Sequence, residues 1–203
     1  MPVRRTWVVA AIAAFVAGIW VASGVSLVPV RVAIGPCLKD WTSPSSYRPR
    51  ASPLATERFR VDGGTVEICY GRPSMRGRQV FGGLVPYDSL WRLGANEPTR
   101  LYTDRHLVLG DLRLEPGRYA LYARPEPSSW TVYVTRSTRH WGNDFSPGVR
   151  AREVGSFTVP VTELEQPVET LTIRPDRRDG ATAIRIAWER TGVTIPLRAG
   201  GGR

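Results

Sequence analysis

With 203 residues the chain has room for one ordinary domain and an additional segment, but hardly for two domains. Its formal net charge is +10, and Lys39 is the only lysine among 28 basic residues. Because arginine codons are rich in G and C, this bias indicates a GC-rich gene, so the charge does not place nucleic acid among the expected partners.

The positive charge is unevenly distributed along the chain. Residues 1–54 have a net charge of +5, whereas residues 55–198 have only +4 over a whole domain. The excess therefore lies beside the apolar N-terminal segment, where anionic lipid headgroups or an acidic partner would meet it. A solvated basic segment without a specific partner is equally compatible with this pattern.

Residues 7–30 form a run of 24 without a charged side chain. As a helix, the run would be about 36 Å long, enough to cross a hydrocarbon core of about 30 Å. The sequence thus predicts a short cytoplasmic tail over residues 1–6 and a transmembrane helix, a signal anchor, over residues 7–30. Small, aromatic and proline residues are expected to set its lipid, helix and interface contacts: Trp7, Gly18, Trp20, Ser23, Gly24 and Pro29.

The alternative is a signal peptide cleaved near residues 21–23. Apolar cores of signal peptides usually have about 7–15 residues, so the longer run here favours an uncleaved anchor. Large domains translocate largely regardless of charge. We therefore expect a single-pass protein of the inner membrane, with the N-terminus in the cytoplasm and the soluble domain in the periplasm.

Residues 31–54 are rich in proline and arginine and predict a stalk. Cys37 lies in this stalk and Cys69 in the first β-rich stretch, so a disulfide between them would join the stalk to the domain in an oxidising compartment. The alternative is two unrelated thiols, with Cys69 buried in its strand.

Residues 55–198 alternate in short apolar and polar steps, interrupted by Gly, Pro, Asp and Asn, which is typical of strands and turns. The pattern predicts a mainly β fold, a single β-sandwich or barrel-like domain, with one helical turn at residues 87–92 and a flexible tail at 199–203. The expected strands lie at 59–61, 66–70, 106–109, 112–114, 118–123, 130–135, 155–161, 170–174, 183–189 and 193–197.

The most distinctive stretch contains RPS at 72–74, GR at 77–78, FGGLVPY at 81–87, WR at 91–92 and GANE at 94–97. Later pieces are PGRY at 116–119, WTV at 130–132, WG at 141–142, PVET at 167–170 and AWE at 187–189, followed by 193–196. Together they resemble the domain-of-unknown-function 2911 family of bacterial, often exported, proteins over residues 57–197. The resemblance implies a compact β-rich fold and no particular activity.

The long glycine-rich connection over residues 72–97 is the candidate binding segment. Guanidinium groups suit bidentate capture of a carboxylate or phosphate, so the connection is a candidate loop for docking an anion, a glycan or a partner. Alternatively, Arg92 or Arg78 pairs with Glu97 as an internal strut. Trp91 and Phe81 would then close one end of the domain. The candidate residues are Arg72, Arg76, Arg78, Arg92, Asn96 and Glu97.

No catalytic, cofactor or metal motif is found in the sequence, so we expect a protein that is not an enzyme and has no cofactor. A hydrolase that uses His106 or His140 with Glu97 is kept as an alternative. The leading hypothesis is a non-enzymatic accessory or scaffolding subunit. Its helix would pack among other integral-membrane subunits and lipid while its β domain contacts the same assembly. A speculative client is a bacterial photosynthetic reaction-centre or light-harvesting complex.

Overall fold

The computed structural model describes residues 50–178 and 180–201. The predicted tail, the anchor at residues 7–30, Cys37 and nearly all of the stalk lie outside these residues. Within the described ranges, no helix has the length and apolar character needed to cross a membrane.

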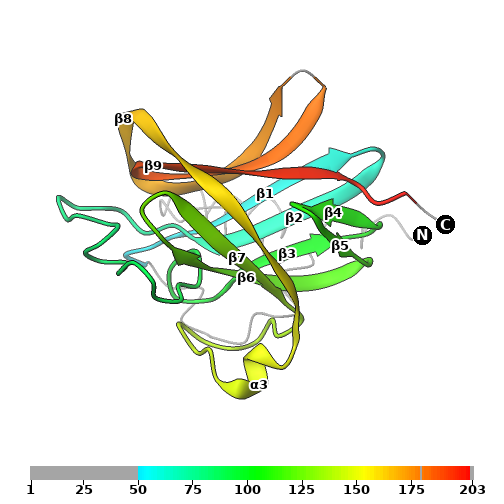
Figure 1. Ribbon diagram of the computed structural model, residues 1–203, viewed down its shortest axis with the longest axis horizontal. Coiled ribbons are helices and arrows are strands. Elements are labelled where there is room, and N and C mark those ends of the chain that lie inside the picture. Colours follow the sequence, from blue (N-terminus) through cyan, green and yellow to red (C-terminus); the bar gives the residue numbers. More distant parts are fainter. Residues whose placement is uncertain (1–49, 179, 202–203) are drawn as a thin grey trace, which may run out of the picture.

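Nine strands form one antiparallel sheet in the order β1-β2-β3-β6-β7-β8-β9-β4-β5 (Figure 1). The elements are β1 Leu54–Val61, β2 Gly64–Gly71, β3 Thr99–Thr103, β4 Leu107–Leu109, β5 Leu112–Leu114, β6 Gly117–Pro125, β7 Ser129–Thr135, the short helix α3 Pro147–Arg150, β8 Glu153–Arg178 and β9 Ala181–Ala199.

Local sequence explains the regular strands. In β7 the residues Trp130, Val132 and Val134 are buried, while Thr131 and Tyr133 are half-buried, as alternation requires. The first hairpin turns at Asp62 and Gly63, which have φ angles of 44° and 81°. Positive φ at both central residues is the geometry of a tight hairpin turn, so the Asp-Gly pair predicts the β1–β2 hairpin correctly.

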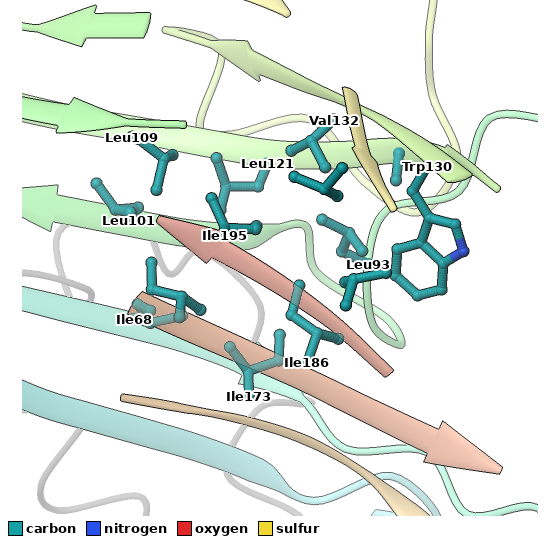
Figure 2. Close-up of a cluster of buried hydrophobic side chains, with 14 of the residues drawn as sticks. Ile68, Leu93, Leu101, Leu109, Leu121, Trp130, Val132, Ile173, Ile186 and Ile195 are labelled. Carbon is teal, nitrogen blue, oxygen red and sulfur yellow. The ribbon is translucent and has the colours of Figure 1, made fainter. Parts of the chain in front are cut away.

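The long strands β8 and β9 bring the two halves of the sheet together. The first part of β8 pairs with β7, up to Ser129↔Pro160. Its second part pairs with β9, from Val161↔Val193 to Arg178↔Ala181. Because β8 belongs to both halves, the sheet bends around one hydrophobic core. Figure 2 shows this core, with Ile68, Leu101 and Leu121 lying opposite Ile173, Ile186 and Ile195.

Tyr70 on β2 joins the two halves through a hydrogen-bond pair. Its hydroxyl donates to the carbonyl of Ile173 at 3.1 Å and accepts from the Ile173 N–H at 2.9 Å. Both groups lie on the side of β8 that has no strand neighbour at this point. A buried backbone group without a hydrogen-bond partner is costly. The Tyr70 hydroxyl therefore supplies the hydrogen bonds that a neighbouring strand would otherwise make with Ile173. Burial raises the pKa of Tyr70, which keeps the hydroxyl protonated.

The prediction of a mainly β domain is confirmed. In its finer architecture the structure has one continuous sheet, and no pairing joins β1 to β5 among the described residues. The expected strands at 155–161 and 170–174 are both parts of β8, and those at 183–189 and 193–197 are both parts of β9. Strand β3 was not predicted.

The prediction of a helical turn at residues 87–92 is wrong. Asp88 has a φ of 59°, which a right-handed helix does not allow. Backbone bonds from Asp88 N to Pro125 O at 2.9 Å and from Trp91 N to Ala123 O at 2.7 Å instead attach this segment to β6.

Replacing Tyr70 by Phe removes only the hydroxyl and leaves both backbone groups of Ile173 without this partner. We expect the free energy of unfolding to fall by about 1–3 kcal/mol, measured by urea denaturation. Tyr102→Phe is the matched control, since the half-buried Tyr102 hydroxyl makes no hydrogen bond among the described residues. Equal stability of the two variants would contradict the closing role of Tyr70.

Candidate functional site

The candidate segment is the connection between β2 and β3, residues 72–98, which lies along one end of the sheet (Figure 1). Its first part runs against the irregular middle of β8. The pairing of β8 with β9 shifts register between Glu163 and Val168 and again between Val168 and Thr172. These irregularities leave backbone groups of β8 available to the connection.

The connection forms hydrogen bonds with those backbone groups of β8, much as a neighbouring strand would. Met75 N donates to Glu169 O at 2.8 Å, and Leu171 N donates to Pro73 O at 2.9 Å. The guanidinium of Arg72 adds a bond from Nε to Leu171 O at 3.2 Å. Arg72 therefore serves to attach the connection to β8.

The next two arginines are exposed, but their side chains also reach backbone carbonyls. Arg78 donates through Nε to Met75 O at 2.9 Å and through Nη2 to Ser74 O at 3.0 Å. Arg76 donates through Nη2 to Ala51 O at 3.1 Å. These bonds stabilise the turn at 74–78 and tie it to the start of the domain.

Glu189 on β9 holds the middle of the connection. Its carboxylate accepts the backbone N–H groups of Val80 at 3.3 Å and Phe81 at 3.1 Å. Glu189 itself has a φ of 55°, a left-handed conformation that costs a non-glycine residue about 1–2 kcal/mol. The strained backbone of β9 thus lies at Glu189, the residue whose side chain forms hydrogen bonds with the connection.

Four aromatic side chains fill the space beneath the connection. Phe81 lies 5.1 Å from Trp130 and 5.9 Å from Trp91, between ring centroids. Trp91 stacks on Trp188 with centroids 5.8 Å apart. Such contacts contribute about 0.5–1.5 kcal/mol per pair beyond burial. The expectation that Phe81 and Trp91 close one end of the domain agrees with these contacts.

Glu97 is buried and forms a two-bond ion pair with Arg50. The Arg50 nitrogens donate to the two carboxylate oxygens at 2.7 and 2.8 Å. The pairing expected with Arg92 or Arg78 is therefore replaced by one with a residue assigned to the stalk. It ties the start of the described chain to the end of the connection.

Arg92 and Asn96 contact the segment at residues 136–146. Arg92 donates from its backbone and its side chain to the Oδ1 of Asn143, at 3.3 and 3.0 Å. The carbonyl of Asn96 accepts from Gly142 N at 3.0 Å. Burial lowers the pKa of Arg92, and the Glu97 carboxylate opposes this shift. The two loops therefore hold each other in place.

The six candidate residues do not converge on one point. Arg72, Arg76 and Arg78 serve the β8 side of the connection, whereas Arg92, Asn96 and Glu97 serve the opposite side. Their hydrogen bonds go largely to backbone carbonyls and to other side chains of the domain. The geometry makes them internal supports of a well-defined loop.

Comparison with known protein families shows which family the chain belongs to. The family model described as protein of unknown function (DUF2911) matches residues 52–197. The chain belongs to the DUF2911 family. This confirms the resemblance found in the sequence. The match covers the whole nine-stranded sheet except the last two residues of β9. No curated protein and no solved structure gives a match.

The two histidines of the DUF2911 domain have other neighbours than the predicted Glu97. His106 Nδ1 lies 3.2 Å from the Oε2 of Glu115. His140 Nδ1 lies 2.8 Å from the carbonyl of Ser137, and its Nε2 is buried without a partner among the described residues. Since a carbonyl only accepts, Nδ1 carries the proton and the neutral ring leaves Nε2 unprotonated.

His140 belongs to a second layer, in which residues 136–152 cover the outer face of β3, β6 and β7. Arg100 on β3 donates to Thr138 O at 2.9 Å, and Thr135 on β7 donates to Val149 O at 3.1 Å. Tyr122 on β6 donates to the Glu153 carboxylate and stacks on Tyr133. Burial, followed by this carboxylate, raises the pKa of Tyr122.

Cys69 is buried on the outer side of β2, and the described part of the domain contains no free cysteine. Its predicted partner Cys37 lies outside the described residues, so the Cys37–Cys69 pairing stays a prediction. The anchor residues from Trp7 to Pro29 likewise lie outside.

Several residues that build this region of the DUF2911 domain were not predicted from the sequence. Tyr70 and Arg50 were not singled out, and Glu189 was noted only as a piece of the family pattern. That pattern was the available signal, because a carboxylate within a strand pattern, beside a buried tryptophan, calls for a specific partner.

Two substitutions at Glu189 separate its carboxylate from its backbone. Both Glu189→Ala and Glu189→Gly remove the acceptor for Val80 and Phe81, and we expect each to be less stable than the natural protein in urea denaturation. The glycine variant should be more stable than the alanine variant by about 1 kcal/mol, because glycine adopts positive φ without strain. The reverse order would contradict the strained conformation.

His140 should make stability depend on pH. Burial lowers the pKa of His140, so the unfolded chain, with an ordinary value of about 6.5, binds the proton more readily. Stability should therefore fall as pH drops below about 6.5, by up to about 1.4 kcal/mol per pH unit. Besides Ser137 O, the groups that act on the ring are Asp144 and Arg100.

The measurement compares urea denaturation at about pH 7.5 and 5.5, either side of the ordinary histidine value. His140→Asn should lose part of the pH dependence, whereas the matched variant His106→Asn should keep it. The same pH dependence in all three proteins would exclude His140 as its source.

Proposed function

We propose that the domain is the binding part of a non-enzymatic, membrane-anchored accessory subunit, and that it contacts a partner protein through its two supported loops. The observation that carries the proposal is where the large exposed hydrophobic side chains lie. Among the described residues these are Leu84, Tyr87 and Trp141, with 43%, 37% and 53% exposure. All three fall on the connection at 72–98 or on the segment at 136–146.

A single exposed apolar side chain is ordinary in a soluble domain. Here the exposed ones share two loops that are hydrogen-bonded to each other, through Asn96 and Gly142 and through Arg92 and Asn143. Exposed apolar side chains on such a surface favour protein contact. Since the arginines of the connection donate to carbonyls of their own domain, fewer of their N–H groups are available to a partner than the sequence indicates.

The loop that carries Leu84 is held in a defined shape. Val85 N donates to Val80 O at 2.8 Å, and Leu84 N donates to Gln79 O at 3.1 Å. A Cβ on Gly83 would lie 2.7 Å from Gln79 O, so only glycine fits there. A preorganised loop loses little conformational entropy on binding, which supports a docking role.

The predicted anchor supports the choice of partner. An uncleaved helix at residues 7–30 would hold the domain at the periplasmic face of the inner membrane, where lipid and other integral-membrane subunits are its neighbours. The client class remains a proposal: a membrane assembly such as a bacterial photosynthetic reaction-centre or light-harvesting complex.

The test uses the full-length protein extracted from its native membranes in mild detergent. We expect it to co-migrate with stoichiometric integral-membrane subunits in native size-exclusion chromatography. A variant with Leu84→Ser, Tyr87→Ser and Trp141→Ser should migrate alone, because it lacks the apolar contacts, while its unfolding temperature stays unchanged.

Glu163→Ser, at an exposed position on β8, is the control and should stay in the assembly. A natural protein that migrates as a lone chain, or a triple variant that remains assembled, would overturn the proposal. The intact mass of the same sample shows whether the anchor is retained, because cleavage near residue 23 would remove the membrane part.

A further inference from the structure

A second feature lies at the other end of the sheet, where β4, β5 and the end of β9 meet (Figure 1). An open hollow of about 760 Å³ is found there, within the size range of small-molecule sites, about 300–1,000 Å³. Its lining residues are His106, Leu107, Arg113, Leu114, Glu115, Gly200 and Gly201.

The guanidinium group of Arg113 is the cationic group of the hollow. Its side chain is exposed on β5 and makes no ion pair or hydrogen bond within the described residues. In register, Arg113 lies opposite Val108, and Val108 lies opposite Arg198 on β9. Residues directly opposite each other share a face of the sheet, so two exposed arginines flank Val108 beside the hollow.

This arrangement differs from that of the arginines in the 72–98 connection. Arg72, Arg76 and Arg78 donate to backbone carbonyls of their own domain, whereas Arg113 keeps its planar set of donors for another molecule. Such a guanidinium recognises a carboxylate through two parallel hydrogen bonds.

His106 and Glu115 form a half-exposed pair on the hollow's wall. With His106 Nδ1 3.2 Å from Glu115 Oε2, the carboxylate orients the ring. The pair leaves His106 Nε2 and the second Glu115 oxygen for further hydrogen bonds. Both suit hydroxyl groups, which donate as well as accept.

Leu107 and Leu114 support the hollow from the core side. They are paired across β4 and β5 and are 3% and 1% exposed, so their side chains belong to the hydrophobic core and fix the position of the two strands. Successive side chains of a strand point to opposite faces, so Arg113 lies on the outer face, and the exposed lining of the hollow is mainly polar. A polar lining suits a ligand with several hydroxyl groups.

We propose that this hollow binds a small carboxylic acid carrying several hydroxyl groups, a sugar acid, with its carboxylate on Arg113 and its hydroxyls on His106 and Glu115. The negative charge of Glu115 disfavours a phosphate dianion at the same place and favours a monoanion whose remaining groups are hydrogen-bond donors. This site is separate from the two loops of the proposed function, so either proposal can fail alone.

The test is titration calorimetry of the full-length protein in detergent micelles with D-glucuronate. We expect saturable binding at millimolar concentrations, and none with D-glucose, which lacks the carboxylate. Inorganic phosphate should bind at least ten-fold more weakly. Arg113→Ala should weaken D-glucuronate binding at least ten-fold, and Arg113→Lys should restore part of it.

Arg152→Ala is the matched control, an exposed arginine outside the hollow, and should bind as the natural protein does. Absence of saturable binding, equal affinity for D-glucose, preference for phosphate, or unchanged affinity in Arg113→Ala would each overturn the proposal. A glucuronate oligomer distinguishes the sources of the ligand: tighter binding than the monomer indicates the end of an acidic polysaccharide, and equal binding indicates the free acid.

Discussion

The irregular middle of the β8–β9 hairpin is the constraint on which the rest of the structure depends. Where its ladder shifts register, β8 turns backbone groups toward β2 and the connection that follows it. Pro73 and Met75 take up those groups, and Tyr70 takes up those of Ile173, just beyond the second shift, where β8 has no strand neighbour on that side. Without these partners the buried backbone of β8 would be unsatisfied. The sheet bends over its core, and the connection takes its course, because these bonds must be made.

The same constraint explains why charged side chains of the connection, including the exposed Arg76 and Arg78, form hydrogen bonds within their own domain. A long irregular segment has few backbone partners within itself, so guanidinium and carboxylate groups provide them. Arg72 and Arg78 bind carbonyls, while Glu189 binds N–H groups. Glu97 and Arg50 complete the far side through a buried ion pair. The apolar side chains Leu84 and Tyr87 are then left outside, the reverse of the usual distribution in a loop.

Elements whose structure depends on residues close to each other in the sequence were predictable, whereas elements that depend on remote residues were not. The β1–β2 hairpin and β7 follow from two-residue turns and alternation, which are local properties. Strand β3 was missed because its buried Arg100 looks polar in sequence, and its burial depends on Thr138 O in a remote segment. The strands expected at 155–161 and 170–174 left a gap between them, yet β8 continues across it with irregular pairing.

The candidate site shows the same limit. A cluster of arginines between glycines has the composition of an anion-binding loop. Only the fold reveals that these arginines donate to carbonyls of their own domain, some of them remote in sequence, such as Leu171 for Arg72. The role of Glu189 depends on a left-handed backbone that no local pattern signals. By contrast, the burial of Phe81 and Trp91 was foreseen, because large aromatic side chains in a long connection need cover.

The position of β9 in the sheet has a consequence for biosynthesis. This strand is the last of the nine to be made, yet it lies between β8 and β4, and its residues from 197 to 199 are the neighbours of β4. A nascent chain therefore lacks an inner strand until translation of the domain is nearly complete. Its early strands cannot close around the core on the ribosome, so the sheet can be completed only after nearly the whole domain has been made.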